Sequence, residues 1–267
     1  GNITLSEIKK LTTSKTKCII AVHMAGYPCE MDKITKFCKK KNIFLIEDCA
    51  HGLGTMYKKK HVGNFGVAGI FSFYPTKQIT TGEGGVIITN NKALINKVKI
   101  IKSIGLNTPP EKRKIQGVYD VTSLGLNYRL TDFQAALAIG QMSRYNKNLK
   151  RRRENAKYYI NEIKKIKELT IQNFDKQNSY FILQVFFKNK KIRNKILMKF
   201  KKQNIGCSIH YATPVPLMTY YKKKYNLNKK KFPSALKYGE NSISLPTHPF
   251  IEKKMINKIL KVIVKNL

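Results

Sequence analysis

Short runs of apolar and often β-branched residues recur along the first ninety residues, and each run stops at charged residues or at Gly and Pro. This pattern is typical of strands in a buried sheet, and it occurs at residues 18–22, 43–46, 67–74 and 86–89. Between the first two runs, residues 31–40 carry apolar side chains at helical spacing. The order strand, helix, strand predicts a parallel pair with a right-handed crossover, so we expect an α/β fold.

Two of the predicted strands lead to residues that can carry chemistry. The run at 43–46 ends in Glu47 and Asp48, and the run at 67–74 continues through a Pro-Thr turn to Lys77. Ligands of open α/β sheets bind where strands end, so Asp48 and Lys77 can converge on one ligand. A lysine forms a Schiff base with a carbonyl, and pyridoxal phosphate (PLP) enzymes add an acid that keeps the pyridine nitrogen protonated. Taken alone, the pair has an ordinary alternative, a helix cap and a solvated lysine.

The sequence segments around Asp48 and Lys77 favour the cofactor-binding interpretation of this pair over the ordinary one. The segments EDCAHGLG, VGNFG and FSFYPTKQITTGEGG follow one another in this order, and they resemble the DegT/DnrJ/EryC1/StrS family of sugar aminotransferases, which are PLP enzymes of fold type I. The resemblance implies that Lys77 forms the Schiff base with the cofactor and that Asp48 pairs with its pyridine nitrogen. It also implies that His51 lies against the cofactor and that Ser72 contacts its phosphate. Without the resemblance, His51 would be a surface histidine and Ser72 an ordinary strand serine.

A second segment, LGLNYRLTDFQAA at residues 124–136, resembles the same family almost letter for letter. It implies that Asn127 reaches across a homodimer with shared active sites to the phosphate of the neighbouring subunit's cofactor. Arg129 is expected in the same region, as part of the substrate site. Without the resemblance, Asn127 would be a turn residue and Arg129 a surface arginine. Thr131 is predicted to cap a long helix that reaches residue 159 and connects two domains.

The last third of the chain predicts an α+β domain. We expect strands at residues 179–187, 206–211 and 241–245, and helices at residues 189–203 and 251–264. The H-Y-x-x-P and S-L-P-x-H-P patterns resemble the family's small domain and imply that His210, Tyr211 and His248 lie near the substrate. A histidine between prolines is equally compatible with a structural turn. The predicted division is a large cofactor-binding domain over residues 1–147 and a small domain over residues 148–267.

Several local features complete the prediction. Ser6 is a candidate cap for a helix over residues 6–11, and Asn189 is one for the helix that follows it. His23, at the end of the first strand, is interpreted as structural rather than catalytic. Cys49 is interpreted as a small buried residue rather than a nucleophile. Residues 103–118 are expected to form a polar loop.

The charge balance is extreme, with 52 Lys and Arg against 15 Asp and Glu and a formal net charge of +37. Such a balance can indicate a nucleic-acid or membrane surface, but here the lysines are spread along the whole chain and no nucleic-acid-binding motif accompanies them. We therefore predict neither a nucleic-acid nor a membrane partner. Five cysteines show no metal-type spacing, which favours free thiols, no metal site and a cytoplasmic location.

Family members begin with a segment that this sequence does not contain. That segment carries a Ser-Gly-Thr-type run at a helix N-terminus, whose backbone N–H groups hold the cofactor phosphate, and an aromatic residue that stacks on the pyridine ring. The sequence therefore predicts a fold type I large domain that is truncated at its N-terminus, with a mixed, mostly parallel sheet flanked by helices.

The function that the resemblance implies is a PLP-dependent aminotransferase in amino-sugar and lipopolysaccharide biosynthesis. It would transfer an amino group from L-glutamate to a nucleotide-linked keto-sugar. PLP-dependent sugar dehydratases of the same family carry histidine at the lysine position, and Lys77 argues against them. A non-catalytic or regulatory relative with an incomplete cofactor site, and a basic nucleic-acid binder, are the remaining alternatives.

Overall fold

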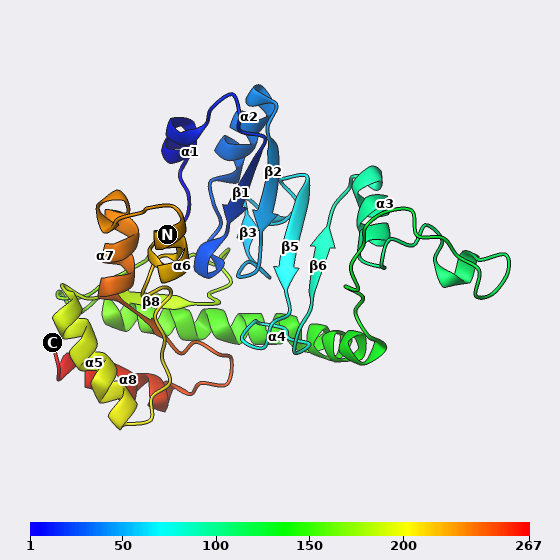
Figure 1. Ribbon diagram of the computed structural model, residues 1–267. Coiled ribbons are helices and arrows are strands. Elements are labelled where there is room, and N and C mark those ends of the chain that lie inside the picture. The colour runs from blue at the N-terminus through cyan, green and yellow to red at the C-terminus, as the bar shows by residue number, and fades with distance from the viewer.

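The first half of the chain is organised by a four-stranded sheet. The computed structural model describes residues 1–267, except for the side chain of Pro110. The strand order is β1-β2-β5-β6, with β1 (Cys18–Val22), β2 (Phe44–Asp48), β5 (Ala68–Ser72) and β6 (Gly85–Ile88) side by side in Figure 1. β1, β2 and β5 are parallel, and β6 is antiparallel to β5. The predicted mixed, mostly parallel sheet is confirmed.

Two helices pack on one face of this sheet. α1 (Leu5–Leu11) and α2 (Met31–Lys41) bury a cluster that includes Ile8, Ile34 and Leu45. The prediction that Ser6 caps α1 is wrong, because the helix begins at Leu5 and the side chain of Thr4 accepts the hydrogen bond from the backbone N–H of Glu7. A 3₁₀ turn, η1 (Met24–Gly26), follows β1.

Smaller elements lie between and after the strands. A short hairpin of β3 (Met56–Tyr57) and β4 (Lys60–His61) separates β2 from β5. After β6, α3 (Lys92–Ile101) leads into the predicted polar loop, which carries the 3₁₀ turn η2 (Pro110–Lys112) and projects to the right of Figure 1.

A long helix, α4 (Asp132–Ile163), links the sheet to the rest of the chain, and Figure 1 shows it running beneath the sheet toward α5 and α8. Thr131 caps it as predicted. The Thr131 hydroxyl accepts from the N–H of Gln134, and the Gln134 side chain accepts from the N–H of Thr131. This reciprocal pair is a capping box, which satisfies two backbone donors at the helix start.

The last third of the chain has its own apolar core, in which Tyr159, Phe200, Ile243 and Ile256 are fully buried. Its elements are an antiparallel sheet and a group of helices and 3₁₀ turns: β7 (Thr170–Ile171), β8 (Leu183–Phe186), α5 (Lys190–Lys202), η3 (Val215–Leu217), α6 (Thr219–Lys224), η4 (Lys229–Lys231), α7 (Pro233–Asn241), β9 (Ser242–Leu245) and α8 (Lys253–Val264). Asn189 caps α5 as predicted.

The predicted strand at residues 206–211 is wrong. Only one isolated bridge forms there, between Ser208 and Ser244. The carbonyl of His210 accepts instead from the side-chain amide of Gln184 at 3.0 Å, so a side chain takes the place of a neighbouring strand.

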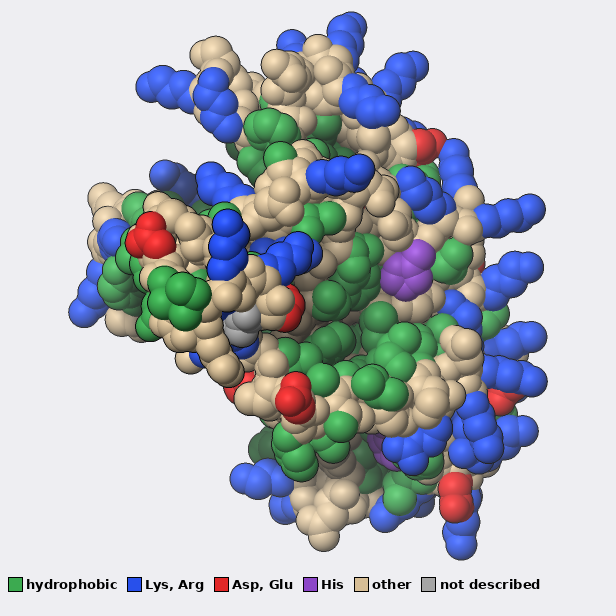
Figure 2. Space-filling view, turned by 90° about the vertical axis from the view of Figure 1, so that its right-hand side faces the viewer, with side chains coloured by type: hydrophobic (Ala, Val, Ile, Leu, Met, Phe, Trp, Pro, Cys, Tyr) green, Lys and Arg blue, Asp and Glu red, His purple; other side chains and the backbone are tan. Residues whose placement is uncertain are grey.

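The basic residues do not gather into one patch on the side of the molecule seen in Figure 2. Lys and Arg side chains project around its margin, whereas hydrophobic side chains gather near its middle. None of the helices in the described part of the chain combines the length and apolar character that a bilayer crossing requires.

Candidate active site

The acid and the lysine singled out by the sequence arrive at the same edge of the sheet. Asp48 is the last residue of β2, and Lys77 lies in the turn that follows the adjacent parallel strand β5. The backbone N–H of Lys77 donates to the carbonyl of Tyr74 at 2.9 Å, which closes this turn. An Asp48 carboxylate oxygen accepts from the N–H of Ala50 at 2.9 Å. The carboxyl ends of adjacent parallel strands thus present both groups to one region.

The environment of Lys77 favours its neutral amine. The side chain is half-buried, and this burial lowers the pKa of Lys77 below its usual range, although the carboxylate of Asp48 opposes the shift. Because the neutral amine is the nucleophile and the proton acceptor, a lowered pKa makes Lys77 more reactive near neutral pH than a surface lysine.

An aromatic ring that the sequence analysis did not single out lies against the lysine. The Nζ atom of Lys77 is 5.1 Å from the centre of the Phe181 ring. The ring of His51 packs on the same phenyl group, with 4.6 Å between the two ring centres. In the sequence, Phe181 belongs to the apolar run SYFILQVFF, where an aromatic residue is indistinguishable from the core residues beside it.

His51 is buried and uncharged. Its Nδ1 atom accepts from the backbone N–H of Ala25 at 3.3 Å, which places the ring proton on Nε2. Burial, followed by the positive charges of Lys77 and His210, lowers the pKa of His51 to about 3. The structure therefore places this histidine beside Lys77 as a neutral ring.

Ser72, which is predicted to contact the cofactor phosphate, lies at the same edge of the sheet. Ser72 ends β5, and its Oγ accepts from the N–H of Tyr74 at 3.3 Å. Among the residues that the structure describes, no acceptor takes the Ser72 hydroxyl proton, which leaves it available to a ligand.

His210 and Tyr211 reach the same neighbourhood from the C-terminal part of the chain. Burial, and then the charge of Lys77, lowers the pKa of His210. Burial, and then the carboxylate of Asp48, raises the pKa of Tyr211. The Nδ1 atom of His210 is 2.8 Å from the hydroxyl of Ser244 in β9, which fixes the orientation of the ring.

Among the described residues, no hydrogen bond or ring contact joins Asn127, Arg129 or His248 to Asp48 or Lys77. Asn127 and Arg129 are exposed in the segment before α4, where the Arg129 Nε–H donates to the Asn127 side-chain oxygen at 3.1 Å. His248 lines a cavity of about 570 Å³ together with Arg152 and with Gln78, the residue next to Lys77. Burial, and then the charge of Arg152, lowers the pKa of His248. Their predicted contacts with cofactor or substrate stay predictions.

A second group missed by the sequence analysis supports the lysine turn from behind. The side-chain amide of Gln78 donates to the carbonyl of Leu53 at 3.0 Å and to the hydroxyl of Ser179 at 3.2 Å. The hydroxyl of the buried Tyr145 in α4 is 3.0 Å from the Gln78 carbonyl oxygen. These contacts tie the residue next to Lys77 to three other segments, so the lysine is held in position.

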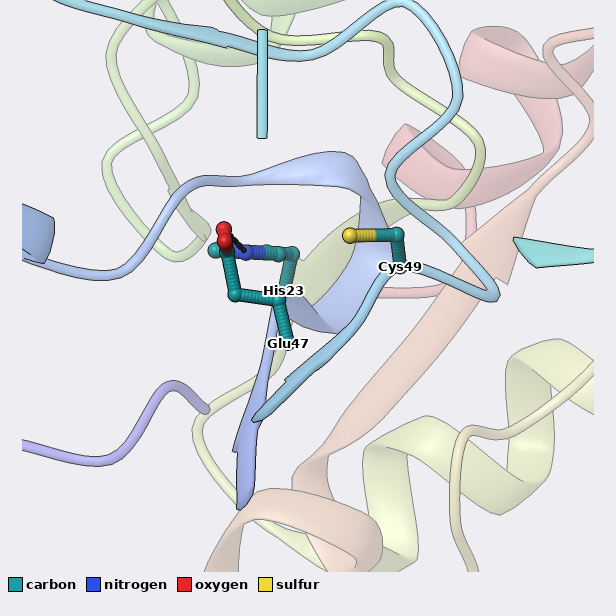
Figure 3. A group of neighbouring side chains, drawn as sticks. All are labelled: His23, Glu47 and Cys49. Carbon is teal, nitrogen blue, oxygen red and sulfur yellow. Dashed lines mark hydrogen bonds and ion pairs between the residues drawn. The ribbon is translucent and has the colours of Figure 1, made fainter. Parts of the chain in front are cut away.

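His23, Glu47 and Cys49 form a compact buried group, shown in Figure 3. The Nδ1 atom of His23 accepts from the N–H of Cys29, so Nε2 carries the proton that it donates to Glu47 at 3.0 Å. Glu47 also accepts from three backbone N–H groups, at Gly63, Phe65 and Gly66. Neither ring nitrogen of His23 has a lone pair left for a metal.

The pKa shifts of Glu47 and Cys49 agree with the role of Glu47 as a hydrogen-bond acceptor for His23. Burial alone would raise the pKa of Glu47, but the hydrogen bond from His23 and those from the backbone outweigh it and hold the pKa below its usual value. Burial, and then the charge of Glu47, raises the pKa of the Cys49 thiol, which keeps it protonated. The predicted structural role of His23 and the buried, unreactive state of Cys49 are in agreement with this geometry.

Comparisons with known proteins identify relatives of this chain in sequence and in structure. The chain matches the DegT/DnrJ/EryC1/StrS aminotransferase family over residues 1–264. It is 37% identical to an uncharacterized protein of Methanocaldococcus jannaschii, over 99% of this chain and 72% of the relative. It is 32% identical to GDP-perosamine synthase of Escherichia coli O157:H7, over 95% of this chain and 66% of that enzyme. The structure of PseC, a Helicobacter pylori aminotransferase involved in the biosynthesis of pseudoaminic acid, superposes with a TM-score of 0.90 at 29% identity, over 99% of this chain and 70% of that one.

The fold and the sequence match define the class of protein, an α/β aminotransferase of fold type I. The chain belongs to the DegT/DnrJ/EryC1/StrS aminotransferase family, whose members are PLP-dependent. It spans between 66% and 72% of the length of the relatives named above.

The residues present at the sheet edge fit the family's cofactor. An aldehyde reacts with the neutral amine of a lysine, and burial lowers the pKa of Lys77, which favours that neutral form. A pyridinium N–H needs a carboxylate acceptor, which Asp48 offers at the end of the neighbouring strand. A phosphate needs hydroxyl or N–H donors, and the Ser72 hydroxyl proton is available for one such bond.

Proposed function

We propose that this chain carries the catalytic lysine of a PLP-dependent aminotransferase that acts on a nucleotide-linked keto-sugar. The observation that carries the proposal is the convergence of Asp48 and a half-buried Lys77 of lowered pKa at the ends of adjacent strands. GDP-perosamine synthase is among the relatives, and its name supports a sugar nucleotide as the substrate class. The amino donor that we propose is L-glutamate, as the sequence resemblance implies.

When bound, PLP supplies an aldehyde for reaction with amines and a ring that accepts electrons. The protein's contribution is to hold that ring and to move protons. The Asp48 carboxylate would hold a proton on the ring nitrogen, and the Ser72 hydroxyl would donate to the phosphate. The Lys77 Nζ atom takes a proton from the amino donor as a base and returns it as an acid. Because burial lowers the pKa of Lys77, its neutral amine, which acts as the base, is more accessible than that of a surface lysine.

The neighbouring rings keep this proton transfer away from water and from competing charge. His51 stays neutral because its pKa is lowered to about 3, so it adds no positive charge beside the Lys77 amine. The phenyl ring of Phe181 packs against both groups. His210 and Tyr211, on the C-terminal side, are proposed to contact the substrate; Arg129 and His248 are proposed to do so on assembly of the complete site.

We further propose that the active protein is a homodimer, with Asn127 close to the neighbouring subunit's cofactor. The segment that carries Asn127 is rich in apolar side chains that face solvent, since Leu124 is 93% and Phe133 76% exposed. Exposed apolar patches of this kind mark interaction surfaces. A Phe133→Lys chain is expected to sediment as a monomer, whereas Met198→Lys, an exposed apolar position on α5, should behave as the parent does.

The proposed function is tested by the first half of the reaction. The chain is incubated with PLP and L-glutamate, and 2-oxoglutarate is measured together with the loss of the cofactor's aldehyde absorbance. Formation of 2-oxoglutarate that disappears in Lys77→Ala supports the proposal, and Asp48→Asn should lower the rate by at least about 100-fold, within the range of acid–base contributions. Product formation that is independent of Lys77 would contradict it.

A further inference from the structure

A strongly basic cavity of about 850 Å³ lies between α1, α2 and the loop that leads from α1 to β1. Lysines, hydroxyl-bearing residues and a few apolar residues line it, and no carboxylate does. The lysines are Lys9, Lys33, Lys36, Lys40 and Lys41. This space is called the α1–α2 cavity below.

The α1–α2 cavity is separate from the proposed cofactor site. Thr16 shortly precedes β1 and Ile43 directly precedes β2, so the cavity lies at the amino ends of these parallel strands. Asp48 ends β2 and Lys77 follows β5, so both belong to the carboxyl edge. In Figure 1 the amino ends are uppermost, because β5 points downward and β1 and β2 run parallel to it.

The lysines of the α1–α2 cavity are close together and mostly unpaired. Lys33, Lys36 and Lys40 follow one another at three and four positions along α2, so they lie on one face of the helix. Like charges at this spacing destabilise a helix. Among the described residues, Lys33 alone of the five forms an ion pair, an exposed one with Glu30. An anion in the cavity would replace this repulsion by attraction.

The abundance of lysine in the chain does not by itself explain the cavity. Lys9 lies in the last turn of α1, and Lys40 and Lys41 lie in the last turn of α2, where cations interact favourably with the helix dipole. Lys33 and Lys36 lie before that turn and lack this explanation. A cavity of about 470 Å³ beside the end of β6 contains no lysine at all. The concentration of lysines is therefore a property of the α1–α2 cavity.

The loop before β1 adds hydroxyl groups that can donate. The Thr16 Oγ1 atom accepts from the N–H of Thr13 at 3.1 Å, and the Thr13 Oγ1 atom accepts from the N–H of Lys15 at 3.3 Å. Within the part of the chain that the structure describes, no acceptor takes the hydroxyl protons of Thr13, Ser14 or Thr16. Ammonium and hydroxyl groups are both donors, and phosphate oxygens are strong acceptors for them.

The apolar side of the cavity suits a ring in addition to an anion. Leu5 and Phe37 line it and are only partly buried, and the buried Ile43 lies beside them. Aromatic side chains are surfaces on which nucleobases stack. The volume falls within the range of small-molecule sites and exceeds what a single phosphate needs.

We propose that the α1–α2 cavity binds a nucleoside polyphosphate. The lysines and the loop hydroxyls hold the phosphates, and Phe37 provides the surface for the base. This site goes beyond the proposed function, because it lies at the opposite edge of the sheet from Lys77. Its ligand can therefore be tested without the cofactor.

The test titrates the full chain with ATP as the probe, by calorimetry and without PLP. We expect saturable one-to-one binding that the combination of Lys36→Gln and Lys40→Gln weakens at least about tenfold, because charge-assisted contacts are lost. The matched control combines Lys195→Gln with Lys199→Gln, two exposed lysines four positions apart on α5. It removes the same charge and should leave the affinity within about twofold, since these lysines lie outside the cavity.

Two further variants identify the ligand's base and its location. Phe37→Leu should weaken ATP at least about fivefold, because base stacking is lost, and should leave the binding of inorganic triphosphate unchanged. Lys77→Ala should leave ATP binding unchanged. All variants should keep the thermal unfolding temperature of the parent, so that a loss of affinity is not a loss of fold.

Four results would overturn the proposal. They are the absence of saturable ATP binding, equal weakening in the two double lysine variants, an equal effect of Phe37→Leu on ATP and triphosphate, and loss of ATP binding in Lys77→Ala. The second would mark a general attraction of anions to a basic protein, and the third a site for phosphate alone. The fourth would place the nucleotide at the proposed cofactor site.

Discussion

The Nζ atom of Lys77 lies 5.1 Å from the centre of the Phe181 ring, although the two residues are separated by more than one hundred positions in the chain. Phe181 comes from the segment after α4, immediately before β8, whereas Lys77 follows β5. The half-buried state of the lysine, which lowers its pKa, therefore depends on packing between the sheet and the C-terminal part of the chain.

Removal of this ring should raise the pKa of Lys77. Phe181→Ala admits water to the amine, and because burial is the largest influence on this pKa, the loss of burial outweighs the loss of the cation–π contact. The pH dependence of Lys77 acylation by a small reagent, followed by mass spectrometry without cofactor, should shift to higher pH. Tyr220→Ala, which removes a ring beside Lys224 at 5.4 Å, should leave the Lys77 profile unchanged. An unshifted profile in Phe181→Ala would show that the ring does not control the amine.

His51 should make the fold sensitive to mild acid. Its pKa is about 3 in the folded protein and near 6.5 in the unfolded chain, so the unfolded chain binds the extra proton between these values. The stabilisation is complete above pH 6.5 and is lost as the pH falls through this window, by at most about 1.4 kcal/mol per pH unit. His51→Gln, which keeps an acceptor for the Ala25 N–H, should show a smaller loss of unfolding free energy between pH 6.5 and pH 4.5. His61→Gln is the matched control, and equal slopes in all three proteins would refute the assignment.

Glu47 should be among the most sensitive positions for stability. Its carboxylate accepts from His23 and from the backbone N–H groups of Gly63, Phe65 and Gly66, and the side chain is fully buried. Glu47→Gln turns one acceptor into a donor that faces other donors, so we expect a loss of roughly 3–5 kcal/mol in the free energy of unfolding. Glu30→Gln, which breaks the exposed pair with Lys33, should cost less than about 1 kcal/mol. Denaturant unfolding with similar losses in both variants would contradict the structural role of the buried group.

The start of α4 should stabilise the Gly-rich turn at residues 81–85, before β6. Gln134 closes the capping box with Thr131, and its side-chain amide donates to the carbonyl of Glu83 at 2.8 Å. Gln134→Ala removes both contacts and should cost about 1 kcal/mol of stability, similar to the loss of a helix cap. It should also speed amide hydrogen exchange at residues 81–85. Ser143→Ala, an exposed change within the same helix, should leave that exchange as it is.

Local sequence patterns predicted the parts of the site that lie at strand ends. Apolar runs that stop at Asp48 and shortly before Lys77 correspond to β2 and β5. The resemblance to the family's sequence motifs added His51 and Ser72 to the predicted site. Phe181 had no such signal. Its role depends on packing between segments distant in sequence, and an aromatic residue inside an apolar run is otherwise an ordinary core residue.

The wrong helix cap, the wrong strand and the overlooked Gln78 all depend on contacts that the local sequence does not show. Ser6 and Thr4 are both good caps, and the choice of Thr4 depends on where the chain enters the helix. The apolar and polar alternation at residues 206–211 suggested a strand, but the Gln184 amide takes the carbonyl of His210 and limits pairing to one bridge. Gln78 was overlooked because a glutamine beside a lysine has no signature until its partners, Leu53, Ser179 and Tyr145, are known.

The central claim, that Lys77 is the residue to which PLP attaches, is tested most directly by incubation with PLP, reduction with borohydride and mapping of the pyridoxyl group by mass spectrometry. The account predicts stoichiometric label on Lys77, lost in Lys77→Ala, with only sparse label on the surface lysines. Label scattered over many lysines, with the same total in Lys77→Ala, would contradict it.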